Sequence, residues 1–326
     1  MRSEGPGLGG AGALAAGVLA ILGLPLLGLS DYAMRVATLT ALYAVAATGW
    51  TLIGGFANQV SLGQATMFGI GGYVSTLLFA RWGVTPWLGG AAGAALAALV
   101  AIALGGVAFR LRGHYFALIT LALAEMVRIV VEYDQPLTGG AQGLSVPLVR
   151  NSLVLLQFAR ARDYYEIAAL LMLAALALAR AIAGWPLGYE LRAVYDDEIA
   201  AALAGVNVRR AKMRAFVAGA ILTALAGTVY AQVTGFIDPD SVLSIPLSIQ
   251  LALYAIVGGA RTWWGPLAGA ALLVPLGELM TSSEAGAGAG ITKVLYGLIL
   301  VAMVIVEPDG LAALLNRRRR GARAQA

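Results

Sequence analysis

The sequence contains no cysteine, a single histidine (His114) and only two lysines (Lys212 and Lys293) among its 326 residues. Without cysteine the chain forms no disulfide and no thiolate zinc site, and one histidine excludes a multi-histidine metal site. Neither lysine is followed by Ser or Thr, so the phosphate-binding loop that ends in Gly-Lys-Ser/Thr is absent. If the protein uses ATP, another chain must bind the nucleotide.

Charged residues are also scarce. They make up 12% of the chain, whereas hydrophobic residues make up 60% and there are 42 glycines. A typical soluble domain has about 25% charged residues and could not bury so large an apolar fraction. The composition excludes a soluble enzyme, a disordered chain and a disulfide scaffold, and it predicts a polytopic helical membrane protein.

Apolar stretches long enough to cross a membrane recur along the whole chain, since a spanning helix needs about 20 such residues. The candidate spans are 8–29, 33–53, 60–80, 86–109, 115–131, 164–183, 213–234, 246–259, 264–279 and 291–306. Three of them, 60–80, 246–259 and 264–279, are short or rich in Gly and polar residues, which favours broken or re-entrant helices. We therefore expect one all-α domain over 1–326, a bundle of about 8–10 spans.

Loop charges predict the orientation, because Lys and Arg are enriched in cytoplasmic loops. The arginine-rich tail 316–326 is expected to be cytoplasmic, and alternating spans then place loop 184–213 and both termini inside and loop 132–163 outside. Fifteen of the 22 Lys and Arg residues fall on the inner side. They are not gathered on one soluble module, so nucleic acid is not expected as a partner.

Loop 184–213 carries helix signals of its own. Pro186 ends the preceding span, the acids of 196–198 suit the first turn of a helix, and Gly205 suits a helix stop. We expect short amphipathic helices joined by a turn. Their small Ala side chains and charged rim would suit a docking surface for another protein. The alternative is a charged inner loop without a partner.

Polar residues inside apolar segments mark candidates for a solute path, because polar side chains at membrane depth should face protein or water. The alternative for the glycines is close helix packing. Glu125 and Arg128 lie three residues apart on one expected helix and can form an ion pair. The path candidates are Asn58, Gln59, Ser61, Gln64, Glu125, Gly258 and Gly259.

Several blocks in order resemble the branched-chain amino-acid (LivM/LivH-type) permease family of ABC importers, over roughly 43–315. The cytoplasmic block reads Leu-Gly-Tyr-Glu-Leu-Arg-Ala-Val, then Asp-Asp-Glu, then an Ala-rich run that ends in Gly. The blocks that carry the resemblance are 58–73, 112–128, 138–144, 187–205, 258–270 and 296–311.

The cytoplasmic block departs from the general importer pattern, which is Glu-Ala-Ala followed by a Gly six residues after the Glu. Here 200–201 and Gly205 fit, but Ile199 stands where the Glu is expected and the acid is Glu198. Whether Asp197 or Glu198 faces a partner stays open. By resemblance, the residues that couple to an ATPase are Arg192, Asp197, Glu198, Ala201 and Gly205.

The resemblance implies a permease subunit of an ATP-driven importer in a bacterial inner membrane. It implies a second homologous permease subunit, two cytoplasmic ATP-binding subunits and an extracytoplasmic solute-binding protein. The solute would be a branched-chain or related amino acid, and the chain would bind no cofactor and catalyse no reaction itself. The alternatives are a permease for urea or short amides, and a secondary transporter or channel in which Glu125 is an ion site.

Overall fold

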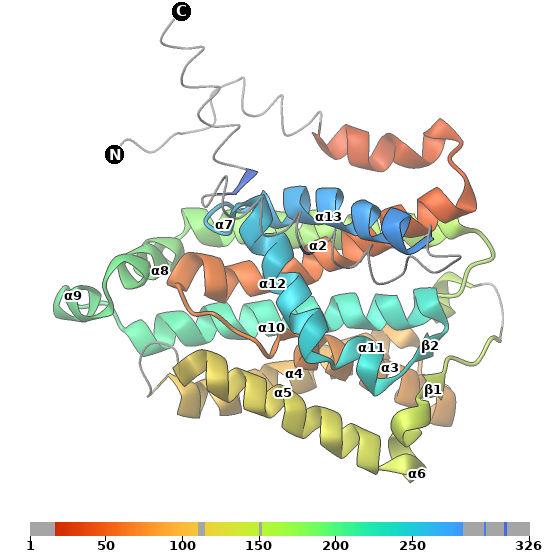
Figure 1. Cartoon of the computed structure of the whole chain (residues 1–326), viewed down its shortest axis with the longest axis horizontal. Coiled ribbons are helices and arrows are strands. Elements are labelled where there is room, and N and C mark those ends of the chain that lie inside the picture. Colours follow the sequence, from red (N-terminus) through yellow and green to blue (C-terminus); the bar gives the residue numbers. More distant parts are fainter. Residues whose placement is uncertain (1–16, 110–114, 150–151, 283–296, 298–309, 312–326) are drawn as a thin grey trace, which may run out of the picture.

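The computed structural model describes residues 17–109, 115–149, 152–282, 297 and 310–311. Long helices run lengthwise through this part of the chain, with α12 crossing the others at an angle (Figure 1). The expected all-α bundle is therefore confirmed. The long helices are α2 (Asp31–Ala57), α3 (Gln64–Trp82), α4 (Pro86–Ala108), α5 (Tyr115–Tyr133), α7 (Ala161–Gly184), α10 (Val208–Thr234), α12 (Ile245–Gly259) and α13 (Gly265–Ser282).

The two ends of the bundle differ in their short elements. At the left of Figure 1 lie α8 (Pro186–Asp196) and α9 (Glu198–Leu203), and we call this the α9 end. At the right, the β end, β1 (Leu144–Ser145) pairs antiparallel with β2 (Phe236–Ile237), Leu144 opposite Ile237. The other short elements are η1 (Leu24–Leu27), α6 (Gln135–Thr138), η2 (Gly140–Gln142), η3 (Leu153–Leu155) and α11 (Pro239–Val242).

Helix α10 is the centre of the bundle and packs on α2, α3 and α4. Glycines allow backbones to touch at these crossings. A Cβ on Gly219 would meet the Gly49 carbonyl of α2, and a Cβ on Gly227 would meet the Phe68 carbonyl of α3. Small residues at helix crossings are the usual way in which membrane helices approach closely. Gly219 and Gly227 therefore serve the close packing of α10 on α2 and α3.

Among the described residues, five helical stretches are long and apolar enough to cross a membrane. They are Asp31–Ala57, Pro86–Ala108, Ala161–Gly184, Val208–Thr234 and Pro239–Gly259, the last of which joins α11 and α12. The segment expected at 60–80 is helical only from Gln64, after a non-helical stretch, and α12 itself has 15 residues. These segments are the ones for which the sequence favoured broken helices.

Other expectations fall partly outside the described residues. The first span, 8–29, is helical from Gly17 onwards, and its earlier part lies outside the described residues, as do 291–296, 298–306 and the tail 316–326. Loop 132–163, expected as an extracytoplasmic connector, contains α6, η2, β1 and η3 in its described parts. Its strand pairing to β2 attaches it to the end of α10.

Candidate functional site

The loop between α7 and α10 folds as the two short helices that the sequence predicts. Helix α7 ends at Gly184 and Pro186 starts α8, where a missing N–H costs nothing. Gly188 lies so close to the Ala183 carbonyl that a Cβ would clash with it. Arg192 donates a hydrogen bond to the same carbonyl at 2.5 Å. Helix α8 is therefore held tightly against the end of α7.

Helix α9 has a defined start and stop. The Asp197 carboxylate caps it, accepting hydrogen bonds from the backbone N–H of Ile199 at 2.7 Å and of Ala200 at 3.1 Å. Gly205 follows the last turn with a φ of +89°, a conformation that favours glycine. The stop signal at Gly205 is confirmed. Asp197 is occupied by its own helix.

The two long sides of α9 differ in exposure. Ala201 is 4% exposed and packs inward. Ile199 is 59% exposed and Leu203 is 86% exposed, and their spacing of four residues places them on one face. Burial of two such large apolar side chains would release ordered water and is therefore favourable.

Glu198 turns toward the bundle instead. Its carboxylate forms an ion pair with the Lys212 ammonium group of α10, and the same oxygen accepts a hydrogen bond from Gln59 Nε2 at 3.0 Å. Lys212 is 2% exposed, whereas the Glu198 side chain is 35% exposed. The two acids therefore have different contacts within the chain. Asp197 caps α9, and Glu198 attaches α9 to the rest of the protein.

Lys212 is a site residue that sequence analysis missed. It counted there only as one inner cation, because it stands among Arg209, Arg210 and Arg214 at the start of α10. Lysine is almost never fully buried unless it is paired, and no local pattern separates Lys212 from its exposed basic neighbours. Gln59, which shares the Glu198 carboxylate oxygen with Lys212, is distant in sequence, so spacing alone could not have supplied it.

The polar residues of the α2–α3 connection, 58–63, divide into two groups. Asn58 is exposed and ends α2 in a left-handed conformation with a φ of +55°, and Gln59 is buried beside Glu198 at the α9 end. Ser61 and Gln64 lie inside the bundle, each 1% exposed. The four path candidates from this segment therefore do not form a single cluster.

Side chains from four helices hold the buried part of this connection. Trp50 of α2 donates from Nε1 to the Ser61 carbonyl at 2.8 Å, and Thr120 of α5 accepts from the Leu62 N–H at 3.0 Å. Gln64 donates to the Thr223 hydroxyl of α10 at 2.5 Å. Ser248 of α12 accepts from the Ala65 N–H at 2.9 Å. The non-helical segment is thus a fixed part of the structure.

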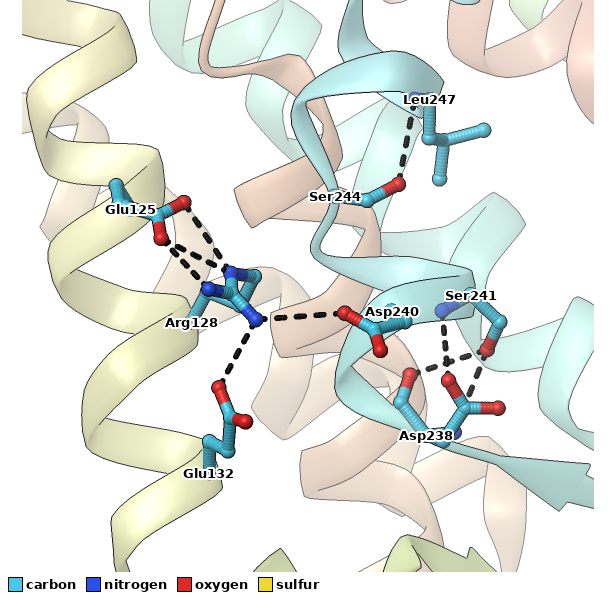
Figure 2. A network of polar contacts seen from close by, with 8 residues as sticks. All are labelled: Glu125, Arg128, Glu132, Asp238, Asp240, Ser241, Ser244 and Leu247. Carbon is cyan, nitrogen blue, oxygen red and sulfur yellow. Dashed lines mark hydrogen bonds and ion pairs between the residues drawn. The ribbon is translucent and has the colours of Figure 1, made fainter. Parts of the chain in front are cut away.

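The predicted ion pair between Glu125 and Arg128 is confirmed, with a closest distance of 2.7 Å. Figure 2 shows that Arg128 also reaches Glu132 at 2.9 Å on the same helix and Asp240 of α11 at 3.3 Å. This group lies toward the β end, far along the bundle from Glu198. The sequence did not reveal Asp240, which is 112 residues away from Arg128.

Caps fix the elements beside this charged group, as Figure 2 shows. Asp238 accepts from the Ser241 N–H at 2.8 Å at the start of α11, and Ser244 accepts from the Leu247 N–H at 3.3 Å at the start of α12. Asp240 is therefore presented to Arg128 by a short helix with a defined orientation.

Gly258 and Gly259 are the last two residues of α12, directly before the tight turn to α13. A Cβ on Gly258 would meet the Gly265 carbonyl, and Gly259 has a φ of +113°. Gly55 of α2 lies against the Ala260 carbonyl of the same turn. A cavity of about 110 Å³ opens nearby, lined by Gly55, Phe56, Ala183, Gly188, Arg192, Tyr195 and Arg261.

Five more buried polar side chains lie outside the set of path candidates. They come from α3 and α10 and have a polar atom without a hydrogen-bond partner among the described residues: Thr66, Tyr73, Ser75, Thr76 and Gln232. Such groups are uncommon in a folded interior and point to contact with water or a ligand. In the described part of the chain no group of three or more His, Asp or Glu side chains is placed to hold a metal ion.

Comparison with known proteins agrees with this arrangement. Residues 32–304 match the family described as "Branched-chain amino acid transport system / permease component". The chain is 30% identical over 299 residues to the high-affinity branched-chain amino acid transport system permease protein LivM of Escherichia coli K12, which covers 85% of this chain and 69% of LivM. It is 28% identical over 288 residues to LivH of the same strain, covering 84% of this chain and 92% of LivH.

No solved structure matches the chain. The family match covers most of the chain, including α8, α9 and the α2–α3 connection. Together with the long apolar helices, it identifies the chain as a multi-pass membrane transport component. The chain belongs to the branched-chain amino-acid permease family of ABC transport systems.

Proposed function

We propose that this protein is the permease subunit of an ATP-driven importer that moves branched-chain or related amino acids across a bacterial inner membrane by alternating access. The names of its relatives LivM and LivH support this solute class. In such a mechanism a path near the membrane midplane opens to one side at a time. Motion produced by ATP in other subunits must reach that path through a rigid element.

The observation that carries the proposal is the construction of α9. It projects from the α9 end, exposes Ile199 and Leu203, and is attached to the bundle through the ion pair of Glu198 with Lys212. An exposed apolar face gives a partner a surface to bind. The attachment gives a movement of that partner a connection to the membrane helices. A channel has no need of such a projecting and attached helix.

Charge supports a cytoplasmic position for the α9 end and for both termini. Basic side chains collect there, as the enrichment of Lys and Arg on the cytoplasmic side of membranes leads one to expect. In the described part of the chain, those on α8, on the first half of α10 and at the nearby ends of α7 and α12 are Arg180, Arg192, Arg209, Arg210, Lys212, Arg214 and Arg261.

The partners follow from this arrangement. Two cytoplasmic ATP-binding subunits would bind α8 and α9, with ATP and Mg²⁺ held in those subunits. A second homologous permease subunit would complete the path, and a solute-binding protein would dock at the β end. Helix α4 offers exposed apolar side chains to lipid or to the second subunit: Trp87, Leu88, Leu96 and Leu99.

The solute path is proposed to follow the polar side chains beside α3. Ser61 and Gln64 lie at its start, and Glu125 with Arg128 lies toward the β end. Groups of both charge signs suit a zwitterionic amino acid, whose carboxylate and ammonium need opposite partners. Gly258 and Gly259 are proposed to contribute by allowing α12 to pack closely on α13.

Co-purification and transport test the proposal. The tagged protein is expressed with its cognate ATP-binding and permease subunits, and leucine uptake by proteoliposomes is measured with and without ATP. We expect the ATP-binding subunits to co-purify and uptake to require ATP. Uptake that persists without ATP under an ion gradient would replace the proposal with a secondary transporter. ATP-dependent uptake of urea or acetamide, but not of leucine, would correct the solute.

A matched pair of variants tests the docking surface. Leu203→Asp places a charge on the outer face of α9, whereas Leu148→Asp does so at the β end, where Leu148 is 88% exposed. We expect Leu203→Asp to lose the ATP-binding subunits because a buried charge in an interface is costly. Leu148→Asp should retain them. Equal co-purification with both variants would contradict docking through α9.

A further inference from the structure

The buried Lys212 ammonium group is energetically costly in an apolar helix bundle unless it is paired. It lies in the second turn of α10, 2% exposed, with its Nζ 5.9 Å from the centre of the Phe109 ring. A charge so far from water needs a close partner of opposite sign. Glu198 supplies the partner from α9. The pair makes α9 part of the bundle although α9 projects from it.

The same carboxylate oxygen has a second function. It accepts the hydrogen bond from Gln59 Nε2 at 3.0 Å, and Gln59 Nε2 also lies 3.3 Å from the Asn58 carbonyl and 3.4 Å from the Ala57 carbonyl. One oxygen atom thus joins α9, α10 and the end of α2. Because hydrogen bonds to a charged group are the strong ones, this contact is more than incidental.

Gln59 lies at the start of the connection between α2 and α3. Its backbone N–H is bonded to the Ile53 carbonyl at 3.1 Å, and the chain then leaves α2 through Ser61 toward Gln64. Further along, the segment is bonded to α5, α10 and α12, as described above. A displacement of Glu198 would therefore act on a segment that contacts the proposed solute path.

We propose that Gln59 is a positioning residue for transport: its hydrogen bond to the Glu198 carboxylate, which pairs with Lys212, joins α9 to the connection 58–63, so that movement of α9 displaces this connection. This inference rests on the proposed function. Gln59 acts here through the Glu198 oxygen and not by contact with the solute or a nucleotide. Lys212 neutralises the carboxylate at the place where α9 meets the non-helical connection.

Two double variants separate this role from a merely structural one. In Glu198→Gln with Lys212→Met, the buried charge is gone but an amide oxygen remains for Gln59. In Glu198→Leu with Lys212→Met, the buried charge is also gone and no acceptor remains. Both replace Lys212, so neither leaves a buried ammonium group without a partner. Both are therefore expected to fold, since an apolar replacement of a buried ion pair is often tolerated.

The experiment uses the complete transporter, with its ATP-binding subunits, in proteoliposomes. Leucine uptake and ATP hydrolysis are measured on the same samples. We expect the Gln-containing double variant to keep most of the uptake per ATP. We expect the Leu-containing one to hydrolyse ATP while its uptake per ATP falls about tenfold, the factor that corresponds to the loss of one hydrogen bond to a buried group.

Controls make the result decisive. Arg214→Met removes an exposed cation from the same region of α10 and should leave uptake per ATP unchanged. Gln59→Leu keeps the ion pair and should resemble the Leu-containing double variant. Equal uptake per ATP in the two double variants would overturn the proposal. If the unmodified complex shows no ATP-dependent uptake at all, the proposed function fails and this inference fails with it, so the two failures are distinguishable.

Discussion

The two charged regions of this protein show how differently the same chemistry can be used. At the α9 end, Lys212 is 2% exposed and shares one carboxylate with Gln59. Toward the β end, Arg128 is 23% exposed and has three carboxylate neighbours, of which the Asp240 side chain is 88% exposed. One region is a closed contact inside the bundle. The other is a partly exposed group in which three carboxylates share one guanidinium group.

Burial explains what this difference means. A buried ion pair cannot lose one member without leaving an uncompensated charge, so its geometry is enforced. An exposed group exchanges its contacts with water and is worth little for stability. The α9 end is therefore suited to transmit a movement. The region around Arg128 is suited to exchange partners, which a solute or another protein requires.

Reversing the charge at each end should produce the largest contrast. Glu198→Lys puts a second cation beside the buried Lys212 and should lower the free energy of unfolding by about 2–3 kcal/mol, less than for a fully buried pair because position 198 is partly exposed. Glu132→Lys should lower it by less than about 1 kcal/mol, because Arg128 keeps two carboxylate neighbours. Thermal unfolding in detergent measures both. Similar losses at the two ends would mean that burial does not distinguish the Lys212 pair from the group around Arg128.

Removing the central cation of the exposed group should have an intermediate effect. Arg128→Met leaves Glu125, Glu132 and Asp240 to repel one another and should cost about 1 kcal/mol. The control is Arg162→Met, which breaks the surface pair of Arg162 with Glu166 at 3.0 Å and should cost only a few tenths. A cost above about 3 kcal/mol for Arg128→Met would mean that the group behaves as a buried one.

Asp240→Asn should have a smaller effect on stability, about 0.3 kcal/mol, because this carboxylate is largely in water and lies 3.3 Å from Arg128. Its effect on transport is the more informative measurement. If α11 and α5 separate during the cycle, the variant changes the rate of leucine uptake without changing its dependence on ATP. Unchanged uptake would place the contact outside the moving parts.

Salt provides the mildest test. Raising the salt concentration to about 1 M shortens the screening length to about 3 Å, so interactions of exposed charges weaken and buried ones do not. The cost of Arg128→Met should fall to about half under these conditions. The cost of Glu198→Lys should stay the same. Unfolding temperatures of each variant at low and high salt, relative to the unmodified protein, measure this difference.

Much of the local structure follows from short-range signals in the chain. Pro186 starts α8, Asp197 caps α9 and Gly205 ends it because each acts on backbone groups within a few residues. The pair of Glu125 with Arg128 is likewise a matter of one helical turn. Such features could be predicted from the sequence. The helical membrane bundle could be predicted as well, because so apolar a chain cannot bury its side chains in a soluble domain.

The sequence by itself determined that this protein is a helical membrane bundle with a short pair of helices between α7 and α10, since composition and local backbone chemistry suffice for that. Only the tertiary structure decided that Glu198, and not Asp197, faces the bundle. Glu198 meets Gln59 across 139 residues, and Asp240 meets Arg128 across 112. No local pattern encodes such contacts, because they exist only once the glycine crossings have brought the helices to their final distances.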